Sequence, residues 1–197
     1  MSTTEAVRSS RREEMVAVAA RLFSERGYHG TSMADLAGVL GLLRGSLYAH
    51  IGSKEDLLYD VVDRGARRFL ERGDGALRLD APPPERLRAF LIGHIETAIE
   101  QLEAGTVFLN EWRYLSDVPR SDIKNKRDRY EDMVRTILSE GIARGEFRAD
   151  LDVPLAARLV LSAGNWIYAW YREGGEMTPR EVGTGFADML VRGLEGS

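Results

Sequence analysis

The stretch that decides the fold is GYHGTSMADLAGVLGLLRGSLYAHIGSKEDLL, which runs from Gly27 to Leu58. Thr31 or Ser32 is a natural helix N-cap, and Asp35 stands at the position of a capping box, as Asp in place of Glu. These residues predict a short helix that ends at about Leu40.

A glycine separates this helix from a second short one. Gly41 breaks the helical pattern, and the next helix is predicted from about Arg44 to His50. Two short helices joined at a glycine, with polar residues at the start of the second, are typical of a helix-turn-helix. Helix pairs of this kind also occur in α-proteins that never touch DNA, so the spacing alone leaves DNA binding open.

Nearly every other long segment has apolar residues at helical spacing, and no alternating run is bounded by hairpin turns. The predicted class is therefore all-α, with about nine helices. The first helix is expected to end at Gly27, and the fourth, capped by Ser53, at about Arg72. The Gly- and Pro-rich stretch from Gly73 to Pro84 is the expected hinge or domain boundary.

The second half continues the helical pattern. Gly145 is expected to end a long helix, and an N-cap at Asp152 opens another that runs to about Arg172. Thr178, followed by a proline and by Glu181 three residues on, starts the last helix.

The quoted stretch resembles the DNA-binding head of the TetR family of repressors. The matching pieces are Gly27, Thr31-Ser32, Asp35-Leu36-Ala37, Gly41, Arg44 to His50 and Ser53-Lys54-Glu55. The resemblance implies an N-terminal three-helix head with a helix-turn-helix, followed by a C-terminal helical domain for ligand binding and dimerisation. We expect the head in residues 1–54 and the second domain in residues 55–197.

The start of the second short helix offers the side chains that a recognition helix needs. Arg44, Ser46 and Tyr48 are polar, and Gly45 permits a close approach to DNA. Arg44 is the first choice as a base reader, because arginine can bridge O6 and N7 of guanine; phosphate is its alternative partner. The resemblance implies phosphate contacts by Thr31, Tyr48, His50 and Lys54. The full expected DNA-binding set is Thr31, Ser32, Arg44, Gly45, Ser46, Tyr48, His50 and Lys54.

Two residues depart from the family pattern. Leu43 stands where the family usually has Ser or Thr to cap the recognition helix, and Ile51 stands where it usually has Phe. The loss of a cap costs about 1 kcal/mol. We therefore interpret Leu43 as a packing residue whose missing cap is replaced by DNA phosphate or water. Packing between the short helices is also expected of Leu36, Leu40, Leu47 and Ile51.

The charge of the chain is unevenly divided. The 197 residues carry a formal charge of -4, which taken whole argues against a nonspecific nucleic-acid coat. Residues 1–54 hold seven basic and five acidic side chains, a net of +2, so the remainder carries -6. A mildly basic head on an acidic body directs the head toward DNA.

Composition narrows the remaining classes. The absence of cysteine excludes disulfides, thiolate metal sites and cysteine nucleophiles, and it fits a reducing compartment. Residues 1–14 lack the apolar core of a signal peptide, and no apolar run approaches the roughly 18 residues of a membrane span, so we expect a cytoplasmic protein with no membrane partner. No GxSxG, HExxH or Walker motif is present, and we expect no enzyme activity, catalytic residue, metal site or cofactor.

Aromatic and polar residues are mixed in two segments of the second half, one around Trp112 and one around Trp166. Buried polar groups need partners, and a ligand can supply them. The expected ligand-binding residues are Phe108, Asn110, Glu111, Trp112, Arg113, Asn165, Trp166, Tyr168 and Trp170. The alternative for each aromatic residue is a place in the core or in a dimer interface.

The stretch from Asp150 to Gly175 also resembles TetR members that respond to acyl-CoA thioesters. The predicted function is a ligand-responsive repressor that binds a palindromic operator as a homodimer and is released by an acyl-CoA. The last two helices are expected to pair with their copies across a two-fold axis. The interface candidates are Leu155, Leu159, Phe186, Met189 and Leu190, and the alternative for each is a place in the core of its own chain. The alternatives are a repressor of an efflux system that responds to amphipathic drug-like molecules, and a helical adaptor without DNA binding.

Overall fold

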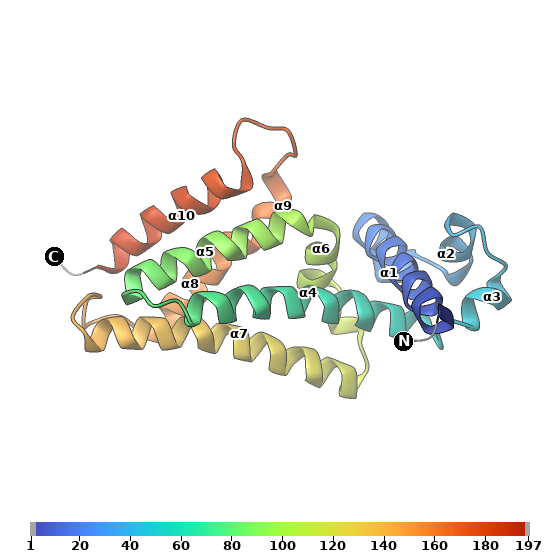
Figure 1. Cartoon of the computed structure of the whole chain (residues 1–197), viewed down its shortest axis with the longest axis horizontal. Helices are drawn as coiled ribbons and strands as arrows, with labels where there is room; N and C mark the ends of the chain where they lie inside the picture. Colours follow the sequence, from blue (N-terminus) through green and yellow to red (C-terminus); the bar gives the residue numbers. More distant parts are fainter. Residues whose placement is uncertain (1–2, 196–197) are drawn as a thin grey trace. The chain divides into compact units, whose positions relative to one another are not determined.

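The computed structural model describes residues 3–195. In this range the chain forms only helices and no β-strand, which confirms the all-α class (Figure 1). The elements are α1 (Thr3–Gly30), α2 (Met33–Val39), α3 (Arg44–Tyr48), α4 (Lys54–Leu77), α5 (Pro83–Glu100), α6 (Leu102–Asn110), the 3-10 helix η1 (Trp112–Tyr114), α7 (Asp117–Ala143), α8 (Val153–Asn165), α9 (Ile167–Trp170) and α10 (Pro179–Leu194). No helix within residues 3–195 is long and apolar enough to span a membrane.

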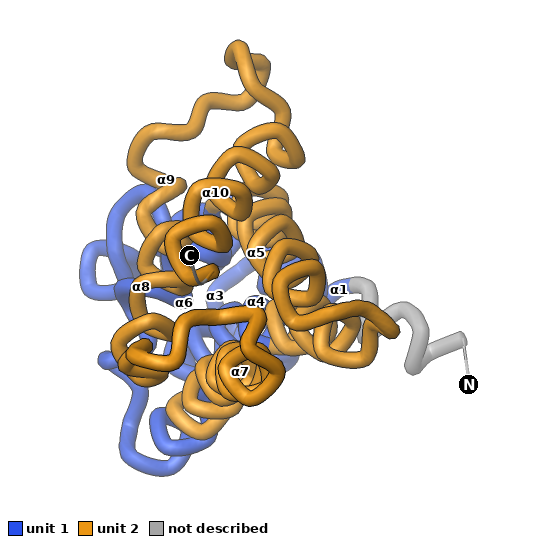
Figure 2. The backbone as a smooth tube through the Cα atoms, turned by 90° about the vertical axis from the view of Figure 1, so that its left-hand side faces the viewer, with its two compact units in different colours: residues 1–66, 103–123 blue, residues 67–102, 124–197 orange. Residues whose placement is uncertain are grey.

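The chain packs as two compact units, which Figure 2 shows in blue and orange. The first unit comprises residues 1–66 and 103–123, and the second comprises residues 67–102 and 124–197. Residues 103–123 therefore pack with the N-terminal helices, from which they are distant in sequence. The expected domain boundary after Lys54 does not coincide with this division and stays a prediction.

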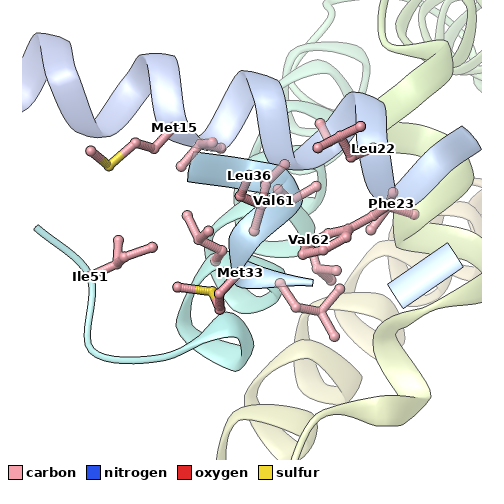
Figure 3. Close-up of a cluster of buried hydrophobic side chains, with 14 of the residues drawn as sticks. Met15, Leu22, Phe23, Met33, Leu36, Ile51, Val61 and Val62 are labelled. Carbon is pink, nitrogen blue, oxygen red and sulfur yellow. The ribbon is translucent and has the colours of Figure 1, made fainter. Parts of the chain in front are cut away.

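One apolar core holds the first unit together (Figure 3). The four residues expected to pack between the short helices, Leu36, Leu40, Leu47 and Ile51, are all buried, as predicted. The core also includes apolar residues of the later segment, namely Val107, Leu115 and Ile123. Because both segments supply buried side chains, residues 103–123 are part of the folded head.

The turn between α1 and α2 follows the local rules of helix capping. Gly27 has φ 74° and ψ 162°, so the helical conformation of α1 is interrupted there, as expected. Ser32 is the N-cap of α2 and forms a capping box with Asp35. The short break between α2 and α3 contains Gly41 with φ 64°, a conformation that glycine adopts without a steric cost.

The second unit contains α5, the main part of α7, and α8 to α10. One face of α5 is buried throughout: Leu87, Phe90, Leu91, His94, Ile95 and Ala98. α10 lies along α5 (Figure 1), and a Cβ atom at Gly183 of α10 would lie 3.0 Å from the Cα atom of Ile92. The glycine therefore permits this close helix pairing.

A polar pair is buried in this core. His94 Nδ1 lies 3.1 Å from the hydroxyl of Tyr130, and burial lowers the pKa of His94 to about 4. A Cβ atom at Gly164 of α8 would lie 2.2 Å from Cδ2 of His94, so the glycine leaves room for the imidazole ring.

Two boundaries differ from the sequence prediction. α4 does not end at Arg72 but continues through Gly73 to Leu77, so the expected hinge begins within a helix. A Cβ atom at Gly73 would lie 2.7 Å from Sδ of Met133 and 2.9 Å from a ring carbon of Tyr130; this glycine permits close packing and breaks nothing. The helix expected to reach Arg172 ends at Asn165, and the four-residue α9 follows it.

Candidate nucleic-acid interface

The recognition helix α3 is anchored by one face and exposes the other. Leu47 is fully buried, whereas the expected DNA-binding residues Arg44, Gly45, Ser46, Tyr48 and His50 are exposed on or beside α3. The guanidinium carbon of Arg44 lies 6.0 Å from the ring centre of Tyr48, so these two side chains share one side of the helix. Exposed polar side chains on an anchored short helix are the arrangement that reads base edges and phosphates in the major groove.

The N-terminus of α2 is stabilised by its own side chains. The hydroxyl of Ser32 accepts a hydrogen bond from the backbone N–H of Asp35 (3.1 Å), and the Asp35 carboxylate accepts one from the backbone N–H of Ser32 (2.7 Å). The hydrogen bonds from the Ser32 side chain and backbone lower the pKa of Asp35. The capping box is confirmed; the DNA contact of the exposed Ser32 stays a prediction.

Two residues expected at phosphates, Thr31 and Lys54, make hydrogen bonds within the head, and their DNA contacts stay predictions. The side chain of Thr31 is 1% exposed, and its hydroxyl lies within hydrogen-bond distance of the carbonyls of Leu22 (3.2 Å) and Gly27 (3.0 Å). In this structure the hydroxyl is therefore occupied by backbone carbonyls, and the phosphate contact of Thr31 stays a prediction. Lys54 Nζ donates to the carbonyls of Tyr28 and Thr31 at 2.8 Å each, and it lies 4.2 Å from the centre of the Tyr28 ring.

The interpretation of Leu43 as a packing residue is wrong. Its side chain is 80% exposed, although it directly precedes α3 and occupies the N-cap position. No side-chain hydrogen bond caps α3. The half-buried neighbour Leu42, and not Leu43, packs against the core of the head.

A contact network joins residues 103–123 to the rest of the first unit. The carboxylate of Glu111 accepts a hydrogen bond from the backbone N–H of Tyr28 (2.8 Å), the residue that follows the break at Gly27. The ring of Tyr114 stacks on that of Tyr28, with 6.0 Å between ring centres, and meets the ring of His29 edge-on at 4.3 Å.

A second point of attachment lies at the start of α4. Glu55 accepts a hydrogen bond from the backbone N–H of Ser116 (2.7 Å), and the hydrogen bonds of the Ser116 side chain and backbone lower the pKa of Glu55. Sequence reasoning missed Tyr28, Glu55 and Tyr114, because the partners are far apart in the chain and no local pattern relates them.

The expected ligand-binding residues fall into two groups. The residues between Phe108 and Arg113 belong to the first unit, and those between Asn165 and Trp170 belong to the second. Within its own unit each group keeps aromatic neighbours: the Trp166 and Tyr168 rings meet edge-on at 5.6 Å, and Arg113 lies 6.0 Å from the ring centre of Trp112. A pocket that contains both groups stays a prediction.

The faces of α8 and α10, together with residues from the segment 148–152 before α8, form a mainly apolar hollow of about 350 Å³ in the second unit. Its lining includes Leu155, Leu159 and Met189, which are 63%, 55% and 67% exposed. These are three of the expected interface residues. Large aliphatic side chains at such exposure on two neighbouring helices are typical of a surface that another molecule covers.

An anchored short helix with an exposed polar face, preceded by a capped helix and a glycine turn, defines a helix-turn-helix DNA-binding protein. The family comparison agrees: residues 15–61 match the family described as bacterial regulatory proteins, tetR family, and residues 80–194 match the tetracyclin repressor-like C-terminal domain. The chain belongs to the TetR family of transcriptional regulators.

Known relatives extend over almost the whole chain. The HTH-type transcriptional repressor KstR2 of Mycolicibacterium smegmatis is 35% identical over 196 residues, which cover 96% of this chain and 93% of KstR2. The structure of the ketosteroid transcriptional regulator KstR2 of Mycobacterium tuberculosis superposes with a TM-score of 0.89 at 30% identity, over 95% of this chain and 96% of that one. The structure of AibR in complex with isovaleryl coenzyme A and operator DNA gives a TM-score of 0.83 at 30% identity, over 92% and 98% of the two chains.

Proposed function

We propose that this protein is a homodimeric repressor that binds a palindromic operator and is released from it by an acyl-CoA thioester. One observation carries the proposal: the segment with five of the expected effector-binding residues is hydrogen-bonded to the DNA-binding head within a single packed unit. An effector that displaces this segment therefore acts directly on the elements that position α3.

The release step follows from the two points of attachment. An acyl-CoA that binds among Phe108, Asn110 and Trp112 shifts α6 and η1, and with them the carboxylate of Glu111. The N–H of Tyr28 loses its acceptor, and the end of α1 relaxes. Such coupling between two sites is typically about 1–3 kcal/mol, which corresponds to a change of roughly 5- to 150-fold in operator affinity.

The effector class is proposed from the relatives. AibR, at 30% identity, has been solved with isovaleryl coenzyme A and operator DNA in one complex. Isovaleryl coenzyme A is a thioester with a short branched acyl chain, and an apolar chain of this kind fits a site lined by the aromatic side chains that we expect to bind the effector.

The dimer is proposed from the apolar hollow between α8 and α10. A second copy of the chain that presents the same face brings leucine against leucine across a two-fold axis and removes these side chains from water. Two heads then contact two half-sites, which is the reason for a palindromic operator.

Fluorescence anisotropy with labelled DNA from the protein's own promoter tests operator binding and release. We expect tight binding that weakens steeply with salt, a loss of affinity in Arg44→Ala, and release by isovaleryl-CoA but not by free isovalerate or CoA. Binding that is indifferent to salt and to Arg44 would refute the operator proposal. Equal responses to the thioester and to the free acid would refute the effector class.

Light scattering of the eluting protein tests the dimer. We expect a dimer mass for the native chain and a monomer mass for Leu159→Glu, because a carboxylate is costly to bury in an apolar interface. The matched control is Leu79→Glu, which places the same charge on an exposed leucine after the end of α4. A dimer that persists in Leu159→Glu would place the interface elsewhere.

A further inference from the structure

Leu43 violates two rules of local structure at once. A leucine at an N-cap forgoes the hydrogen bond that Ser or Thr would supply, and a leucine that is 80% exposed contributes almost nothing to the core. The fold therefore gains neither a cap nor packing from this side chain. A residue that breaks a local rule without a structural gain is a sign of a functional constraint.

The backbone holds Leu43 in a fixed place. Its φ and ψ of -69° and 144° are extended, and its carbonyl accepts hydrogen bonds from the N–H groups of Ser46 (2.9 Å) and Leu47 (3.2 Å). On the other side, the N–H of Leu42 donates to the carbonyl of Ala37 (2.9 Å). The exposed leucine thus has bonded backbone on both sides and directly precedes the exposed Arg44.

The chemistry of the major groove offers one partner for such a side chain. Base edges there present hydrogen-bond donors and acceptors, and the one apolar group on them is the 5-methyl of thymine. Leucine has no polar atom in its side chain, so it can discriminate bases only through that methyl group. A phosphate group can form neither a hydrogen bond nor an ion pair with a leucine side chain.

We propose that Leu43 packs on the 5-methyl group of a thymine in each operator half-site and thereby determines part of the sequence specificity. The proposal rests on the operator binding proposed above. Leu43 is then a specificity residue beside Arg44: the leucine recognises a methyl group, and the arginine recognises polar atoms of a base or phosphate. The missing cap of α3 is the structural cost of placing an apolar group at this position.

The test removes the methyl group and nothing else. An operator is first obtained by selection from random double-stranded DNA with the full-length protein, and each thymine of the half-site is then replaced by deoxyuridine. We expect one thymine per half-site whose replacement weakens binding about fourfold, and about fifteenfold when both half-sites are changed, as for the loss of one buried methyl group each. In Leu43→Ala the same replacement is expected to have no effect.

Two further variants separate recognition from folding. Leu43→Ser restores a side-chain cap, so we expect it to raise the melting temperature while it abolishes the difference between thymine and uracil. The control is Val118→Ser, an equally exposed apolar residue of the first unit, which is expected to leave that difference intact.

The outcomes are distinct. The inference is overturned if the native protein binds every uracil-substituted operator as tightly as the parent, or if Leu43→Ala keeps the native discrimination. A selection that enriches no DNA at all overturns the operator binding itself.

Discussion

Glu111→Ala is the substitution that most directly tests the link between residues 103–123 and the head. In the native protein the Glu111 carboxylate accepts the backbone N–H of Tyr28 at 2.8 Å, and the bond is partly buried. The variant leaves this N–H without its charged acceptor. A hydrogen bond to a charged group contributes about 1.5–3 kcal/mol, and water replaces part of it at a partly buried site, so we expect a loss of about 1–2 kcal/mol.

The assay is thermal unfolding of the full-length protein, followed by operator titrations with and without effector. For a chain of this size the expected loss lowers the melting temperature by about 2–8 °C. Operator affinity is expected to fall, and the effector is expected to change it less than in the native protein, because the attachment through which it acts is already broken. Glu103→Ala, on an exposed residue of α6, is the matched control and is expected to behave as the native protein.

Equal melting temperatures of Glu111→Ala and Glu103→Ala would refute a stabilising role for the hydrogen bond between Glu111 and Tyr28. An unchanged melting temperature together with a loss of effector binding would show that Glu111 contacts the effector, as the sequence predicted. It would then have no part in holding Tyr28.

Three further predictions concern single residues. Lys54→Met is expected to lose about 2 kcal/mol of stability, because two backbone carbonyls lose their hydrogen-bond donor. We expect the salt dependence of operator binding to stay unchanged in this variant. A slope of log Kd against log salt that falls by about 0.9 per head would instead identify Lys54 as a phosphate contact. Gly164→Ala is expected to lower the free energy of unfolding in urea by about 1–3 kcal/mol, because its Cβ atom would clash with His94. Gly185→Ala is the control: its Cβ atom would lie in open space, and we expect it to raise the free energy of unfolding by about 0.5–1 kcal/mol. The pKa of His94 is lowered to about 4 in the folded state, so the imidazole binds a proton more tightly in the unfolded chain. The free energy of unfolding is therefore expected to fall as the pH drops from about 6.5 to about 4, by up to roughly 3 kcal/mol. His94→Gln is expected to lose that part of the pH dependence, and an identical pH profile in this variant would contradict the assignment.

Features that depend on a few neighbouring residues could be predicted from the sequence. The capping boxes of Ser32 with Asp35 and of Thr178 with Glu181 are present as expected. Gly41 and Gly145 have positive φ at the ends of helices, where the pattern placed them. Caps and turns are set by groups within three or four residues of one another, so a local pattern contains all the information they need.

Features that depend on the packing of the folded chain could not be predicted from the sequence. Gly73 follows the same local rule as Gly145, yet it lies inside α4 because side chains of α5 and α7 occupy the space that its Cβ atom would fill. Likewise Thr31 carries the polar group that phosphate contacts need, but its hydroxyl is buried against carbonyls of α1. For Gly73 the competing side chains come from residues that no local window contains. For Thr31 the two carbonyls belong to residues only four and nine positions earlier, and it is the packing of the head that buries the hydroxyl against them.

The sequence by itself determined the all-α class, the helix-turn-helix and the exposed polar face of α3. Only the tertiary structure decided that residues 103–123 fold with the head, that Glu111 and Lys54 hold the end of α1, and that Leu43 faces outward. The physical reason is that the periodicity of one helix shows which face is apolar but not which other helix covers it. The short helix that follows Gly41 could therefore be predicted from the sequence. The exposure of Leu43 could not, because it depends on which side chains the core of the folded head buries.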